Sequence, residues 1–193
     1  MTLFEAYEKT LKTLEEHKLP EPGPDTYLLL EKLCGASRSD IHVHGDRELS
    51  PEQEKDLKAA IDRRLTREPL QQILGETEFM GLPFIVSDQV LCPRQDTEIL
   101  VEEVMRYLHD GYRILDLCTG TGCILLSLLH YSNDIHGIGV DLSENALEVA
   151  EKNRLALELE EKSLFLQGDL FVALEKAPED MRRFEIITSN PPY

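Results

Sequence analysis

Hydrophobic positions recur at helical spacing through the first third of the chain, and capping motifs mark where helices begin. Residues 2–5 have the T-x-x-E form of a capping box, and the apolar positions that follow fall on one helical face. Residues 50–53, Ser-Pro-Glu-Gln, predict a helix from 51 to about 67. A further apolar segment at 27–33 ends at a glycine. We therefore expect a small helical-bundle domain over residues 1–74.

The pattern changes at Gly75. Two short segments, 76–79 and 82–86, flank Met80-Gly81 and predict a β-hairpin, with an irregular connection as the alternative. We treat residues 75–90 as a hairpin linker between two domains.

From residue 96 onward, helical and strand patterns alternate. Helices are expected at 96–109, 121–131 and 143–158, and strands at 113–117, 135–140, 164–167 and 184–189. This alternation is typical of an α/β domain with a doubly wound parallel sheet, here over residues 91–193.

The first predicted strand runs through Asp116 into Cys118-Thr119-Gly120-Thr121-Gly122 and then into a helix. Glycine lets a backbone approach a ligand closely, and a helix N-terminus favours a carboxylate or phosphate. Many such turns are glycine-rich for packing alone, so this loop is ambiguous by itself.

The next two predicted strands each end near an acid. Asp141 is placed to accept hydrogen bonds from ribose hydroxyls, and Asp169 to accept from an adenine amino group while Leu170 packs on the ring. Either acid could instead cap the following helix. Taken together, the three strand ends predict an adenosine ligand. Because the loop lacks the P-loop and dinucleotide glycine patterns, S-adenosylmethionine fits better than NAD.

The chain closes on Asn190-Pro191-Pro192-Tyr193, directly after an apolar, β-branched strand. The prolines stop the sheet and make a rigid loop at the carboxyl end of that strand. The loop offers a planar amide, a backbone carbonyl and an aromatic face, which suit an amide or an exocyclic amine. A plain proline-rich turn is the alternative.

Composition narrows the class of protein. Of 193 residues, 41% are hydrophobic and 30% charged, which is typical of a folded chain. Twenty basic residues against 37 acidic ones give a net charge of −17, which argues against duplex DNA as a partner. We find no signal peptide or membrane span, and four cysteines without a C-x-x-C pair indicate free thiols in the cytoplasm. His42 and His44 alternate as on a strand but lack partners, so no metal site is expected.

The whole chain resembles the release-factor glutamine methyltransferases of the HemK/PrmC type. The resemblance rests on residues 67–75, the hairpin, the segment 90–98 with its Pro-Arg-x-Asp-Thr-Glu, the glycine loop, Asp141 and the final tetrapeptide. It implies a Rossmann-like class I methyltransferase fold and S-adenosylmethionine as the donor. The implied reaction is N5-methylation of the glutamine in the Gly-Gly-Gln motif of class I peptide chain release factors. It also implies substrate recognition by residues 1–74 and a monomeric full-length form.

The resemblance also implies roles for particular residues. Cofactor binding falls to Cys118, Thr119, Gly120, Thr121, Gly122, Asp141, Leu170 and Asn190. Catalysis falls to Asn190, Pro191 and Tyr193, and substrate binding to these three and Pro192. Cys118 stands where the family usually has the first loop glycine. The family continues past the tetrapeptide with further strands. We therefore expect the 193-residue chain by itself to have an incomplete sheet, to be inactive and to self-associate.

We expect the side-chain carbonyl of Asn190 and the backbone carbonyl of Pro191 to accept the two N–H bonds of the substrate amide. Orientation must then supply much of the rate, because an amide nitrogen is a poor nucleophile. Two rivals remain open. One is an adenine-N6 DNA methyltransferase, which uses a similar loop on a flipped base. The other is a binding module without activity.

Overall fold

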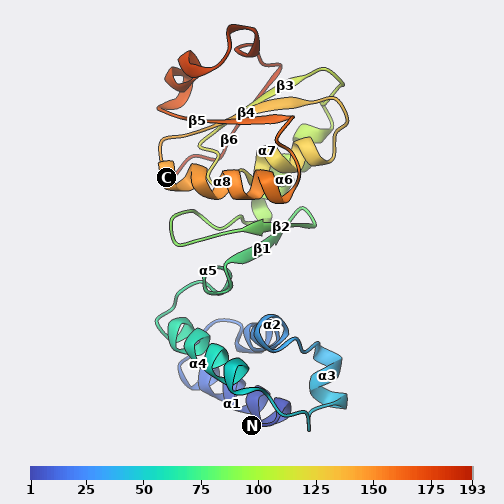
Figure 1. Ribbon diagram of the computed structural model, residues 1–193, viewed down its shortest axis with the longest axis vertical. Coiled ribbons are helices and arrows are strands. Elements are labelled where there is room, and N and C mark those ends of the chain that lie inside the picture. Colours follow the sequence, from blue (N-terminus) through green and yellow to red (C-terminus); the bar gives the residue numbers. More distant parts are fainter. Residues whose placement is uncertain (193) are drawn as a thin grey trace. The chain divides into compact units, whose positions relative to one another are not determined.

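The computed structural model describes residues 1–192, and Tyr193 lies outside the described residues. The chain divides into two compact units, the first spanning Met1–Leu74 and the second beginning at Gly75 (Figure 1). Each unit has its own buried apolar core. In the described part of the chain, no helix combines the length and the apolar character that a membrane crossing requires.

The first unit is helical, as the sequence pattern predicts. Its helices are α1 (Leu3–Glu16), α2 (Pro22–Cys34), α3 (Arg38–Val43), α4 (Pro51–Leu65) and α5 (Leu70–Leu74). Thr2 and Ser50 both form complete capping boxes. The short helices α3 and α5 were not predicted. Because His42 lies in α3, the strand-like interpretation of the two histidines is wrong.

A buried ion pair fixes α2 against α4 inside the first unit. Arg64 Nε donates to Asp25 Oδ2 at 2.8 Å, and Arg64 Nη1 donates to the backbone carbonyl of Glu68 at 3.0 Å. Both side chains are buried, so each charge depends on the other for compensation. The pair also holds the segment that leads into α5.

The second unit is built on one parallel sheet. Its strands are β3 (Arg113–Leu117), β4 (His136–Asp141), β5 (Ser163–Gln167) and β6 (Ile186–Ser189), in the spatial order β5-β4-β3-β6. The chain moves from β3 to β4 and β5 in one direction and then returns to place β6 on the other side of β3. This reversal creates a topological switch point at β3, where open α/β sheets bind ligands.

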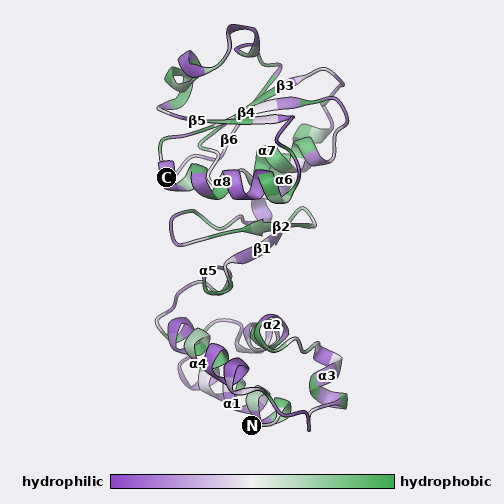
Figure 2. Cartoon of the chain, in the orientation of Figure 1, coloured by the Kyte–Doolittle hydropathy of each residue, from purple (hydrophilic) through white to green (hydrophobic). Residues whose placement is uncertain are grey.

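Helices cover one face of this sheet, and two 3₁₀ segments cover the other (Figure 1). The helical face carries α6 (Gln95–Met105), α7 (Cys123–His130) and α8 (Glu144–Ala156), and the other carries η1 (Leu170–Lys176) and η2 (Glu179–Met181). The three helices are shorter than predicted, and η1 and η2 were not predicted. Figure 2 shows α7 as mostly apolar, in agreement with the burial of Cys123 through Leu129, whereas α8 is mixed.

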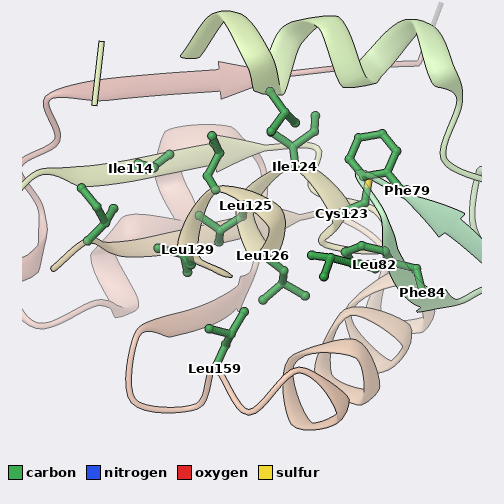
Figure 3. Close-up of a cluster of buried hydrophobic side chains, with 13 residues drawn as sticks. Phe79, Leu82, Phe84, Ile114, Cys123, Ile124, Leu125, Leu126, Leu129 and Leu159 are labelled. Carbon is green, nitrogen blue, oxygen red and sulfur yellow. The ribbon is translucent and has the colours of Figure 1, made fainter. Parts of the chain in front are cut away.

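Side-chain alternation along β3 assigns its residues to two separate cores. Ile114 packs in a cluster with the buried face of α7 (Figure 3). Leu115 and Leu117 join a second cluster with Ala173 and Ala177 on the opposite face. A strand buried on both faces is expected for a parallel sheet covered on both sides. The fold is therefore the predicted Rossmann-like α/β arrangement.

The hairpin forms as predicted and is packed into the core of the second unit. Strands β1 (Glu76–Phe79) and β2 (Leu82–Ile85) pair antiparallel, and Phe79, Leu82 and Phe84 are buried in the cluster that contains α7 (Figure 3). The apolar residues of alternate positions share one face, which the second unit buries. At the turn, Met80 N–H donates to Glu98 Oε1 at 2.7 Å, and the Tyr131 hydroxyl donates to the Met80 carbonyl at 2.6 Å.

One buried amide joins the hairpin, α8 and the glycine loop. Asn153 on α8 is fully buried. Its Oδ1 accepts from Ile85 N–H at 2.6 Å, and its Nδ2 donates to the carbonyls of Ile85 (3.1 Å) and Thr121 (3.0 Å). Asn153 thus satisfies three backbone groups from two distant segments.

Replacement of Asn153 by alanine should therefore strongly destabilise the second unit. Three backbone groups lose their partner, although the two bonds to Ile85 are only partly buried. An unsatisfied buried group costs about 1–3 kcal/mol, so we expect a loss of roughly 2 kcal/mol or more. Chemical denaturation measures it. Asn145→Ala on the exposed side of the same helix is the matched control and should change stability by less than about 0.5 kcal/mol. Equal effects of the two substitutions would contradict the role given to Asn153.

Candidate active site

The carboxyl ends of the four parallel strands meet at one edge of the sheet and border a cavity of about 390 Å³. The segments after β3, β4, β5 and β6 all contribute to its lining, together with a stretch that precedes α6. The lining residues are Gln89, Val90, Leu91, Cys118, Gly120, Val140, Asp141, Leu142, Ser143, Ala146, Gly168, Asp169, Leu170, Asn190 and Pro192.

The glycine loop reaches this cavity through two of its five residues. Cys118 and Gly120 line the wall, and both have left-handed backbones, with φ of 58° and 55°. The usual glycine position is thus occupied by a residue for which this conformation costs energy. Thr119, Thr121 and Gly122 are not in the lining. Thr119 and Thr121 are buried, and a Cβ on Gly122 would meet Leu126 and Phe165 at 3.0 Å.

Asp141 joins the glycine loop to the start of α8. Its Oδ2 accepts from Gly120 N–H at 2.9 Å and its Oδ1 from Ser143 N–H at 3.0 Å. A carboxylate has about four lone-pair sites, so two remain for a ligand in the cavity. Ser143 caps α8 through its own hydroxyl, which accepts from Ala146 N–H, so Asp141 is not needed as the cap.

Exposed leucines stand at the mouth of the cavity. Leu142 is 71% exposed and Leu170 45% exposed, although both line the cavity wall. Leu170 was predicted to pack on a ligand ring, and Asp169 beside it also lines the wall. Leu142 was not predicted from the sequence to line the site, and neither were Gln89, Val90 and Leu91. The apolar residue after the strand-end acid was a signal for Leu142. Val90 and Leu91 belong to the segment 90–98 that carries the family resemblance, but no role was assigned to them, and Gln89 had no signal.

The charged side chains that line this cavity are acidic. Asp141 and Asp169 contribute carboxylates, and no Lys or Arg occurs among its described lining residues. Neither acid has a salt-bridge partner among the ion pairs found in residues 1–192. Such a wall favours a ligand that carries positive charge over one that carries several phosphates.

A second cavity of about 570 Å³ borders the first. Its lining residues are Leu91, Arg94, Asp96, Thr97, Leu100, Ser189, Asn190, Pro191 and Pro192. Three of them, Leu91, Asn190 and Pro192, also line the first cavity. Residues of the Pro-Arg-x-Asp-Thr-Glu segment and residues 190–192, far apart in sequence, thus line the same cavity.

Asn190 stands where the two cavities meet. Its side-chain Nδ2 donates to Thr97 Oγ1 at 3.3 Å, and the side chain is partly buried. Pro191 and Pro192 follow it and are exposed. The predicted site residue Tyr193 lies outside the described residues, so its place in the site stays a prediction.

A buried carboxylate ties the strand before Asn190 to the strand before the glycine loop. Asp116 has no exposed surface, and its carboxylate accepts from Thr119 Oγ1 at 2.6 Å and from Thr188 Oγ1 at 2.8 Å. Ser189 donates its hydroxyl to the Leu117 carbonyl at 3.0 Å. Desolvation by burial raises the pKa of Asp116 to about 6, although the two threonine hydrogen bonds lower it. No function was predicted for Asp116 from the sequence.

Family comparisons cover both units. Residues 5–75 match the family described as PrmC N-terminal domain, and residues 108–192 match the family described as methyltransferase domain. The release factor glutamine methyltransferase of Koribacter versatilis is 37% identical over 100% of this chain and 68% of its own length. That of Caulobacter vibrioides is 35% identical over 100% of this chain and 66% of its own length.

The chain spans about half to two thirds of the length of the first curated relatives that it matches. Among solved structures, a SAM-dependent methyltransferase from Agrobacterium tumefaciens aligns with 61% of this chain and 39% of its own. The sequence identity to that structure is 19%, and the TM-score is 0.48.

The buried carboxyl of Asp116 should make stability depend on pH. Its folded pKa of about 6 is above its ordinary value of 3.8, so ionising it opposes folding. Relative to Asp116→Asn, which cannot ionise, the wild-type chain should gain stability as pH falls from 7 through 6 toward 4. The difference between 6 and 3.8 corresponds to roughly 3 kcal/mol. Urea unfolding of both proteins at several pH values measures it, and a constant gap would refute the assignment.

Proposed function

This chain belongs to the release factor glutamine methyltransferase family, and from that premise we propose that it methylates the N5 atom of a glutamine in class I peptide chain release factors. The proposed target is the glutamine of their Gly-Gly-Gln motif, and the proposed donor is S-adenosylmethionine. The observation that carries the proposal is the position of Asn190, which lines both cavities and so can touch donor and acceptor at once.

The first cavity suits the donor. S-adenosylmethionine combines an adenosine with a sulfonium and an amino group, so it brings positive charge and no phosphate to a wall that holds Asp141 and Asp169. We assign the ribose hydroxyls to the free lone pairs of Asp141 and the adenine ring to Leu170. Cys118 and Gly120 would contact the methionine portion. The inward-facing Thr119, Thr121 and Gly122 would support the loop.

The second cavity suits an amide-bearing side chain. With Nδ2 of Asn190 directed at Thr97, its Oδ1 has no partner within residues 1–192 and can accept one N–H of the substrate amide. The backbone carbonyl of Pro191 would accept the other, and Pro192 and Tyr193 would complete the pocket. Two carbonyl acceptors fix the orientation of the amide nitrogen, and well-oriented reactions gain roughly 7–11 kcal/mol.

The reaction balances without a further reactant. The amide nitrogen forms a bond to the methyl carbon while the carbon–sulfur bond breaks and its electron pair returns to sulfur, which leaves a neutral thioether, S-adenosylhomocysteine. The nitrogen becomes acidic as its bond to carbon forms, and its proton then passes to solvent. Asn190 and Pro191 supply orientation and polarisation, and neither has to act as a strong base.

We assign residues 1–74 to recognition of the protein substrate, because both cavities are lined by the second unit alone. The full-length protein would act as a monomer on its release factor in the cytoplasm. Four free cysteines agree with such a reducing compartment.

Asp141→Ala should weaken S-adenosylmethionine binding by an order of magnitude or more. The ribose hydroxyls lose a charged acceptor whose hydrogen bonds are worth about 1.5–3 kcal/mol each. Titration calorimetry with the natural polypeptide that contains this sequence measures the affinity. The matched control is Asp134→Ala, which removes an exposed acid just before β4, outside the lining of both cavities. Unchanged affinity in Asp141→Ala would remove the ribose assignment.

Asn190→Ala should retain the fold but abolish methyl transfer to a release factor. The amide would lose one of the two carbonyls that orient it. Mass spectrometry of the release-factor glutamine detects the product, and circular dichroism checks the fold. A near-normal rate in the variant would make Asn190 a turn residue only. If the wild type methylated duplex DNA instead of the protein, the adenine-N6 reaction would replace the present proposal.

A further inference from the structure

The orientation of the Asn190 side chain is decisive for the reaction proposed above. A side-chain amide has a carbonyl end that accepts hydrogen bonds and an amino end that donates them. Only the carbonyl end can accept an N–H of a substrate amide. An asparagine that is free to rotate would present the wrong end, or neither end, for part of the time. Something must therefore hold the amide of Asn190 in place.

The neighbouring strand residues are held by side-chain hydrogen bonds to different partners. Thr188 bonds to the Asp116 carboxylate and Ser189 to the Leu117 carbonyl, both on β3. Asn190 continues this series, but it bonds across to α6 through Thr97. Among the hydrogen bonds of the described residues, this is the only one that the Asn190 side chain makes.

Thr97 is itself firmly held. Its backbone N–H donates to the Arg94 carbonyl at 2.9 Å in the first turn of α6. The next residue, Glu98, bonds to the hairpin turn at Met80, and Val101 one turn later is fully buried in the core. The backbone of Thr97 is thus held in the first turn of α6, whereas the loop that carries Asn190 follows the end of a strand.

We propose that Thr97 is a positioning residue that engages the amino end of Asn190 and leaves its carbonyl end facing the substrate. The inference deepens the proposed function and rests on it. Thr97 lines only the second cavity, so its effect should reach methyl transfer and spare donor binding. The hydroxyl of Thr97 is required to hold the Asn190 amide, whereas its methyl group is not.

Three substitutions in the natural polypeptide that contains this sequence test this role. Thr97→Val keeps the shape and removes the hydroxyl, so kcat at saturating donor and release factor should fall about tenfold, as expected for loss of one hydrogen bond. The dissociation constant for S-adenosylmethionine should stay within about twofold. Thr97→Ser restores the hydroxyl and should recover most of kcat. Thr77→Val on β1, a matched substitution away from both cavities, should change neither quantity.

A kcat for Thr97→Val equal to that of the wild type would overturn the proposal, and so would a Thr97→Ser variant as slow as Thr97→Val. A second measurement needs neither catalysis nor a folded valine variant. In ¹⁵N NMR of the wild type, the Asn190 side-chain amide, identified by its loss in Asn190→Ala, should exchange with solvent more slowly than the exposed Asn133 amide. Fast exchange would show that Thr97 does not hold it.

The two hypotheses fail in different ways. If the wild type does not methylate a release factor, the proposed function fails, whereas fast exchange of the Asn190 amide would refute the contact with Thr97 in an active or an inactive protein. If the wild type is active and Thr97→Val is equally active, the proposed function survives and the role of Thr97 is refuted.

Discussion

The site depends on one buried carboxylate at the end of β3. Asp116 has no exposed surface, and it accepts hydrogen bonds from Thr119 at the start of the glycine loop and from Thr188 on β6. It therefore connects the two segments that border the switch point of the sheet. Because burial raises its pKa to about 6, the charge is held at a cost in stability that the two hydroxyls reduce. Residues that follow β3 and β6 in the chain line the first cavity, and residues that follow β6 line the second.

Two residues that line the first cavity have strained backbones. Cys118 and Leu170 line it with φ of 58° and 45°, values that residues other than glycine rarely adopt. Non-glycine residues in such conformations cost about 1–3 kcal/mol each and persist where the surroundings determine them. At Cys118, neighbouring loop contacts from Thr119 to Asp116 and from Gly120 to Asp141 supply that constraint. The loop can thus keep its shape without the usual first glycine.

Two neighbouring residues in the first turn of α6 make contacts in different directions. Glu98 binds the hairpin turn at Met80, while its neighbour Thr97 faces Asn190. The hairpin therefore supports α6, because Phe79 and Phe84 pack in the same core cluster as Val101 of that helix. Adjacent residues of one sequence motif therefore serve two purposes: Glu98 binds the hairpin, and Thr97 binds Asn190 in the candidate site.

Local patterns in the sequence determined the longer helices, the strands, the capping boxes at Thr2 and Ser50 and the strand-end positions of Asp141, Asp169 and Asn190, because these depend on periodicity and on residues close in the chain. Tertiary structure decided the rest. The hairpin resembled a linker in the sequence because its packing partners in α6, α7 and α8 are distant along the chain. Distant neighbours also decided which loop residues line the first cavity. The lining includes Leu142 and residues 89–91 but excludes Thr119, Thr121 and Gly122. Whether a side chain faces a ligand or the core depends on neighbours that are distant in sequence, which no local pattern records.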